Sequence, residues 1–229
     1  MKHIIISNLL IELEKKKIKN MYLRILPPDG SVHISAPVRM SEDEIKRFVE
    51  SKLEWIELQQ RKIQQRHTKQ EMLYVTGEVV YAWGRKFNLI VLETGARHKL
   101  SFDGEDIILH VKADSSTEQR AKVMNYWFRE ALQQEIPALI AKWERIIGVK
   151  SNDWTIRDMK TRWGTCNIRS KRICLNLQLA KKPPKCLEYV VIHELVHLLE
   201  KSHNSVFKGY MDQFLPKWRS IKKELNGME

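Results

Sequence analysis

The stretch His193-Glu194-Leu195-Val196-His197 has the pattern H-E-x-x-H, the strongest indication of fold and chemistry in this chain of 229 residues. Residues four apart on a helix share one face, so both imidazoles can reach a single metal ion while Glu194 lies beside them. Apolar neighbours favour a helix packed in a core over a solvated charge cluster. These neighbours are Leu187, Val190, Val191, Leu195 and Leu198, and Pro183-Pro184 upstream is compatible with a helix start.

A third histidine, His203, follows six residues after His197, so three of the eight histidines lie within eleven residues. A catalytic zinc site takes three protein ligands and keeps an open position for water, and we expect His203 to be the third ligand. A continuous helix would carry His203 about 9 Å further along the axis and onto a different face. The helix should therefore end around residues 199–202, and because that stretch has no glycine, Ser202 or Asn204 should take the turn.

Asp212 and Glu224 are the other candidates for the third ligand, since a carboxylate on a following helix serves in some related metal sites. A metal held in this way lowers the pKa of its bound water towards 7. Glu194 would accept the proton of that water and later return it. Imidazole ligands with an open position favour one Zn²⁺ per chain, although nickel, cobalt or manganese can occupy similar sites.

The rest of the chain predicts an α+β fold, because strands come first and long helices later. Strands are predicted at 21–26, 31–36, 79–83, 86–92, 98–102, 107–111, 154–159 and 172–179, with a strand or loop at 161–167. A helix of about 41–65 begins with a capping box of Ser41 and Glu44, and a second at about 118–147 is interrupted at Pro137 and stops near Gly148. No internal repeat is visible. We expect a β-rich N-terminal region over 1–112 and a catalytic region over 113–229.

The composition is that of a globular protein with a basic excess. Apolar residues make up 43% and charged residues 30%, and Lys+Arg outnumber Asp+Glu by 40 to 28, which favours anionic partners. No apolar run approaches the roughly 20 residues of a membrane span, and the stretch 1–17 is too polar for a signal peptide. Three cysteines without a C-x-x-C pattern indicate a reducing compartment, so a cytoplasmic protein without a membrane partner is expected.

Several further motifs accompany the histidines. They are Arg162-Trp163-Gly164-Thr165-Cys166, Leu175-Asn176, Glu188-Tyr189-Val190-Val191-Ile192 running into the H-E-x-x-H, His203 with Phe207, and more loosely Ile34-Ser35-Ala36-Pro37 and Trp55. Together they resemble the YgjP-like metallopeptidases, which are relatives of the WLM and SprT-like zincin proteins. The resemblance implies a minimal zincin-like catalytic region: a backing helix, a twisted sheet whose edge strand lines the cleft, and the metal helix.

The resemblance also assigns roles to residues of this chain. The metal positions of the family map onto His193, His197 and His203, and its general base maps onto Glu194. Family members more often have Ser in place of Thr165 and Trp in place of Lys208.

The candidates for the substrate cleft are Arg162, Trp163, Gly164, Thr165, Cys166 and Asn176. A glycine in a strand permits close approach of another backbone, and an edge strand can pair with an extended peptide. The alternative is a core tryptophan, a turn glycine and a buried free thiol, with Cys166 as a further possible metal ligand. Residues 157–185 contain nine basic residues and one acidic residue, Asp158. This stretch is either an ordinary solvated face or a surface that attracts an anionic substrate or nucleic acid.

Three functions fit these features. The first is a zinc metallopeptidase acting on a peptide or protein substrate. The second is a metal-dependent nucleotide phosphohydrolase, a pyrophosphatase, because cations stabilise a transferring phosphoryl group, although no glycine-rich phosphate loop is present. The third is a basic, nucleic-acid-associated binding protein with a structural metal, although no sequence-reading DNA-binding motif accompanies the basic stretch.

Overall fold

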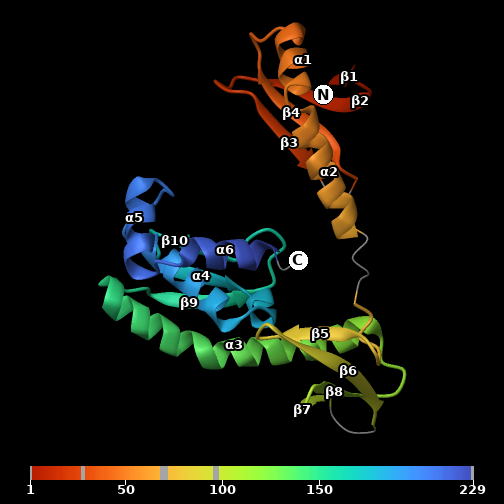
Figure 1. Cartoon of the computed structure of the whole chain (residues 1–229), viewed down its shortest axis with the longest axis vertical. Helices are drawn as coiled ribbons and strands as arrows, with labels where there is room; N and C mark the ends of the chain where they lie inside the picture. Colours follow the sequence, from red (N-terminus) through yellow and green to blue (C-terminus); the bar gives the residue numbers. More distant parts are fainter. Residues whose placement is uncertain (1, 27–28, 68–71, 95–97, 228–229) are drawn as a thin grey trace. The chain divides into compact units, whose positions relative to one another are not determined.

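The computed structural model describes residues 2–26, 29–67, 72–94 and 98–227, which belong to two compact units, 1–71 and 72–229. Each unit has a hydrophobic core cluster of its own. Figure 1 labels the helices and strands of both units. Helices combined with three mixed sheets confirm the predicted α+β class.

Unit 1 is a four-stranded sheet followed by helices. The strands are β1 (Lys2–Ile6), β2 (Leu9–Lys16), β3 (Tyr22–Leu26) and β4 (Ser31–Pro37), in the spatial order β1-β2-β4-β3. The predicted capping box is confirmed, because the Ser41 hydroxyl accepts from the Glu44 amide at 3.2 Å while the Glu44 carboxylate accepts from the Ser41 amide at 2.8 Å.

The single helix predicted over about 41–65 is wrong, because two helices occupy this range. They are α1 (Glu42–Glu50) and α2 (Leu53–His67). The Ser51 hydroxyl donates to the Phe48 carbonyl at 2.7 Å, and the Lys52 amide donates to the Val49 carbonyl at 2.9 Å. These shorter-range bonds tighten the last turn and end the first helix, which a hydrophobic pattern does not reveal.

Unit 2 begins with a second four-stranded sheet and a long helix. The strands are β5 (Val79–Ala82), β6 (Arg85–Glu93), β7 (Lys99–Asp103) and β8 (Asp106–Val111), followed by α3 (Thr117–Ile147). The predicted interruption at Pro137 is wrong, since α3 continues through it. Proline deprives the Gln133 carbonyl of its helical partner, but both residues are exposed, so water can replace the lost bond. The predicted stop is confirmed at Gly148, which ends the helix with a φ of 78°.

The two four-stranded sheets share one topology. In each, two antiparallel strands form a hairpin, the second strand pairs in parallel with the fourth, and the third pairs antiparallel with the fourth. The hairpin turn has positive φ at Ser7 and Asn8 in the first sheet, and at Trp83 and Gly84 in the second. The fold therefore contains a repeat that the sequence does not show, because backbone pairing recurs while most side chains differ.

The rest of unit 2 carries the candidate site. A three-stranded sheet has the order β10-β11-β9, formed by β9 (Asp153–Arg157), β10 (Gly164–Asn167) and β11 (Arg172–Asn176). A 3-10 helix, η1 (Leu177–Lys181), takes the end of the strand predicted over 172–179, which is therefore too long. Three helices follow: α4 (Pro184–Val196), α5 (Ser205–Phe214) and α6 (Trp218–Gly227).

The boundary expected at residues 112 and 113 lies inside unit 2, between β8 and α3. Buried residues of β6 and β8, such as Leu89 and Leu109, belong to the same core cluster as Phe128 of α3. No helix in the described ranges combines the length and apolar character needed to cross a membrane.

Candidate metal centre and cleft

Helix α4 presents the H-E-x-x-H motif. Pro184 occupies its first position, and nine of its residues are buried, so most of the helix surface packs in the core. His193 and His197 lie one turn apart on the remaining face, with ring centroids 4.9 Å from each other. The predicted helix over this motif is confirmed.

The chain turns back sooner than the sequence indicates. The last residue of α4 is Val196, and the amides of Leu198 and Leu199 donate to the carbonyls three residues earlier at 3.0 and 2.9 Å. Neither Ser202 nor Asn204 has a positive φ; the Asn204 side chain instead accepts from the Phe207 amide at 3.0 Å and begins α5. The expected end at 199–202 is thus a few residues too late.

The turn brings His203 against the other two histidines. One nitrogen of each ring can be chosen so that the three atoms lie within 4.8 Å of one another, and Nε2 of His203 is 2.9 Å from Nε2 of His193. Phe207 packs against all three rings, with centroid distances of 4.9, 4.7 and 4.8 Å. Three imidazoles packed against an apolar ring form a donor set that fits a divalent metal.

The protonation of the rings favours this use. The Nδ1 atom of His197 lies 3.1 Å from the Glu200 carbonyl, which holds the ring and leaves Nε2 available as a ligand. Burial, followed by the charges of His197 and His203, lowers the pKa of His193 to about 3. The pKa of His203 is lowered as well, first by burial. His193 and His203 are therefore neutral at ordinary pH, which is the form of imidazole that binds metals.

Glu194 lies beside the histidines and is only 4% exposed. Burial raises the pKa of its carboxyl to about 8, against an opposing effect of the Arg162 charge. Strand β10 runs directly over it: a Cβ atom on Gly164 would lie 2.6 Å from Oε1 of Glu194 and 2.8 Å from Cγ1 of Val190. Only glycine allows this approach.

A cleft of about 650 Å³ surrounds these groups. Segment 161–168, helix α4, the following turn and helix α6 line it. Its lining residues are Thr161, Arg162, Trp163, Gly164, Thr165, Cys166, Ile168, Tyr189, Val190, His193, Glu194, His197, Lys201, His203, Lys222, Leu225 and Asn226.

The structure brings most of the predicted site residues together. Arg162, Trp163, Gly164, Thr165 and Cys166 all line the cleft, and β10 is an edge strand. Burial, followed by the Glu194 charge, raises the pKa of the Cys166 thiol to about 11, so this cysteine is a neutral group in the cleft wall.

Three residues considered from the sequence lie outside the cleft. Asn176 is 3% exposed, and its Nδ2 atom donates to the carbonyls of Met159 and Arg162 at 2.7 Å each, so it holds the loop that leads into the cleft wall. Asp212 accepts from Nε1 of Trp218 at 2.8 Å. Glu224 forms an ion pair with Lys185 at 2.7 Å.

The cleft residues of α6 could not be predicted from the sequence. Trp163 donates from Nε1 to the side chain of Asn226 at 3.1 Å, which joins α6 to the cleft wall. Lys222 and Leu225 lie on the same helix and face the same cleft. The sequence of α6 shows an amphipathic helix, but nothing local to it indicates which surface it covers.

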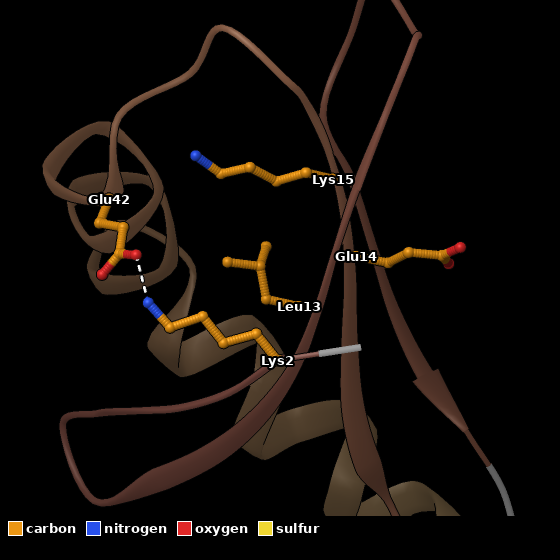
Figure 2. A pocket seen from close by; sticks show the side chains of 5 residues that line it. All are labelled: Lys2, Leu13, Glu14, Lys15 and Glu42. Atoms are coloured by element: carbon orange, nitrogen blue, oxygen red, sulfur yellow. Dashed lines mark hydrogen bonds and ion pairs between the residues drawn. The ribbon is translucent and has the colours of Figure 1, made fainter.

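A second hollow lies in unit 1, lined by Lys2, Leu13, Glu14, Lys15 and Glu42. Figure 2 shows Lys2 paired with Glu42, while Glu14 points away from them. The Lys15 ammonium donates to the Met40 carbonyl at 2.7 Å. Its charged groups have partners already, and it lacks the clustered imidazoles of the cleft in unit 2.

The α+β fold of unit 2 and its cluster of imidazoles beside a buried carboxylate are those of a metal-dependent hydrolase. Residues 19–228 match the model of a family described as YgjP-like, metallopeptidase domain. The chain therefore belongs to the YgjP-like metallopeptidase family, and it is a metal-dependent hydrolase of the metallopeptidase class.

Two solved structures are similar to part of the chain. One is the metallopeptidase zymogen of Pyrococcus abyssi abylysin, with 21% sequence identity and a TM-score of 0.37. The matched region covers 39% of this chain and 90% of the abylysin chain. The other is the metallopeptidase zymogen of Methanocaldococcus jannaschii jannalysin, with 19% sequence identity and a TM-score of 0.37. The matched region covers 41% of this chain and 95% of the jannalysin chain. No curated protein matches the chain.

Proposed function

We propose that the chain is a zinc-dependent peptidase in which His193, His197 and His203 hold the metal and Glu194 is the general base. The observation that carries this proposal is the convergence of the three imidazoles within 4.8 Å on the helix face beside a buried carboxylate. Zinc bound by these rings would supply Lewis acidity and an activated water molecule. Other divalent metals can occupy the same ligand set.

Glu194 is suited to proton transfer. Its pKa of about 8 lies near neutral pH, where a group can both accept a proton from water and return it to a leaving amine. Its position against Gly164 leaves the carboxylate few orientations, which keeps it beside the histidines.

The edge strand β10 supports a peptide as the substrate. Its partner β11 lies on one side, and no strand in the described residues pairs with its other edge. An extended peptide could add to that edge through backbone hydrogen bonds and pass along the cleft. Arg162, Trp163, Thr165 and Cys166 would then contact its side chains. The free thiols fit the cytoplasmic location expected from the sequence.

The metal site is tested by the zinc content of the wild type, His203→Ala and Asp212→Ala after identical loading and dialysis. We expect about one zinc per chain in the wild type and in Asp212→Ala, and a clear loss in His203→Ala, because two imidazoles bind zinc less tightly than three. Full zinc retention by His203→Ala together with loss of zinc in Asp212→Ala would identify the Asp212 carboxylate as the third ligand.

The activity is tested by incubating the zinc-loaded wild type with an unfolded protein such as casein and, separately, with nucleoside triphosphates. We expect cleavage of the protein by the wild type and at least a hundredfold slower cleavage by Glu194→Gln, which keeps its zinc. Release of pyrophosphate or phosphate from the nucleotides without cleavage of the protein would favour the phosphohydrolase. A protein that is inactive on both substrates would favour a structural metal.

A further inference from the structure

Three positively charged side chains line the cleft in unit 2. Arg162 comes from the loop before β10, Lys201 from the turn after α4, and Lys222 from α6, so three separate segments each direct one cation to it. Among the described residues that line this cleft, Glu194 is the one acidic side chain. Since Glu194 is assigned to proton transfer, the cations have no permanent counter-charge in the cleft.

Some other cations of unit 2 already have carboxylate partners. Arg172 pairs with Asp153 at 3.6 Å, Lys185 with Glu224 at 2.7 Å, and Arg219 with Asp212. By contrast, Arg162, Lys201 and Lys222 are exposed and form no ion pair within 4.0 Å in the part of the chain that the structure describes. Lys222 instead lies 5.9 Å from the ring centroid of Trp218.

Two of the cations lie in the same cleft as the candidate metal ligands. Arg162 and Lys222 line it together with Glu194, His193 and His203. Two of the cations are therefore near enough to act on a charged group bound beside the histidines. An anionic group on a substrate would gain from both without displacing an existing ion pair.

We propose that this cleft selects peptides with a carboxylate close to the bond that is cleaved, and that Arg162, Lys201 and Lys222 bind this carboxylate. The proposal rests on the peptidase function proposed above and specifies its substrate class. The carboxylate can belong to an acidic side chain or to the C-terminus of the peptide, because both present the same group to the cations. Charges this exposed act through solvent, so the preference should weaken as salt is added.

Binding to the zinc-loaded Glu194→Gln protein tests the proposal without relying on turnover. Fluorescent peptides of one unstructured sequence are compared by anisotropy, with Glu or Gln near the centre and with a free or amidated C-terminus. We expect about tenfold tighter binding of a peptide with a carboxylate than of its neutral counterpart, and a smaller ratio at high salt. The Glu–Gln pair and the free–amidated pair show separately which carboxylate is recognised.

Helix α6 offers a matched control. Lys222 lines the cleft, while the next residue, Lys223, is also exposed but does not line it. In the same Glu194→Gln background, Lys222→Met should reduce the tenfold preference to about twofold, and Lys223→Met should retain it. An equal loss in both variants would assign the preference to the overall charge of the protein and overturn the proposal.

The remaining outcomes are also distinct. Equal binding of acidic and neutral peptides overturns the inference, whether or not the wild type cleaves them. A preference for the carboxylate peptides without cleavage by the zinc-loaded wild type supports the binding site and overturns the peptidase function. Binding of a nucleoside triphosphate with no binding of any peptide overturns the inference in favour of a phosphorylated ligand.

Discussion

At the scale of single residues, Gly164 and Glu194 show how closely the parts of the candidate site depend on each other. The missing side chain of Gly164 leaves the space that the Glu194 carboxylate occupies, because an added Cβ atom would approach Oε1 to 2.6 Å. The same contact removes Glu194 from water and contributes to its raised pKa. One glycine thus decides both the position and the protonation of the carboxyl group.

Gly164→Ala should reduce hydrolysis at least tenfold while the protein keeps its zinc. The new methyl group forces the Glu194 carboxylate away from the histidines, and a small displacement of a reacting group costs much of its rate. We expect the three imidazoles to stay in place because all three rings pack against Phe207. Activity and zinc content measured on the same preparation check this, and undiminished activity would contradict it.

Glu194 also predicts a pH dependence of stability in the metal-free protein. Its pKa is about 8 in the folded protein against 4.5 as the ordinary value, so between these values the folded state holds a proton that the unfolded state has lost. The stabilisation is complete below about pH 4.5 and is lost as the pH rises towards 8. Glu194→Gln cannot lose this proton, so its melting temperature relative to the wild type should rise across that range.

Thermal melts of the metal-stripped wild type and Glu194→Gln at several pH values measure this difference directly. His193 contributes in the opposite direction, since its pKa of about 3 in the folded protein means that stability is lost as the pH falls below about 6.5. Because both proteins contain His193, its contribution cancels in the comparison. A difference in melting temperature that is constant with pH would contradict the raised pKa of Glu194.

At the scale of elements, the hairpin turn between β5 and β6 is attached to the start of the metal helix. The amide of Trp83 donates to the Ala180 carbonyl at 2.8 Å, and the amide of Gly84 to the Lys181 carbonyl at 3.3 Å. Gly84 has a φ of 77°, and a Cβ atom there would lie 2.7 Å from the Pro183 side chain. The second sheet thereby supports the segment from which α4 begins.

Gly84→Ala should therefore destabilise the protein more than Gly104→Ala. Both glycines have a positive φ, but nothing lies within 4 Å of a Cβ atom on Gly104, so that variant carries only the backbone strain. The strain costs about 1–2 kcal/mol, and the contact with Pro183 should add about 1–3 kcal/mol at Gly84. Urea unfolding of both variants measures the difference in the free energy of unfolding. Equal losses in the two variants would show that the contact with Pro183 does not destabilise the protein.

At the scale of the whole molecule, the residues that the structure describes form two hydrophobic cores that share no residue. The core of unit 1 contains Ile45 and Ile34, and the core of unit 2 contains Ile192 of α4, all with 0% exposure. Each unit therefore gains its stability from its own buried surface. The histidine cluster is carried by the unit that contains the second core.

Substituting one core should leave the other intact. Ile45→Ala and Ile192→Ala each remove similar buried surface and should each cost about 3 kcal/mol in their own unit. Zinc content is expected to fall in Ile192→Ala and to stay at the wild-type level in Ile45→Ala. Hydrogen exchange followed by mass spectrometry locates the loosened unit, and loss of zinc in Ile45→Ala would show that the units are coupled.

Features that depend on neighbours three or four residues apart could be predicted from the amino-acid sequence. The capping box at Ser41, the helix that carries His193 and His197, and the stop at Gly148 follow from such local bonds and spacings. The strands at 79–111 were also predictable, because alternation and turn residues mark them within a few positions.

Tertiary structure decided what depends on contacts between distant segments. The hydrophobic pattern did not reveal the end of α1, the continuity of α3 through Pro137, or the repeated topology of the two sheets. Lys222 reaches the cleft, and Gly164 covers Glu194, only because segments that are remote along the chain lie side by side in the fold. Packing sets such contacts and the pKa values that follow from them, because burial and long-range charge exist only once the elements have come together.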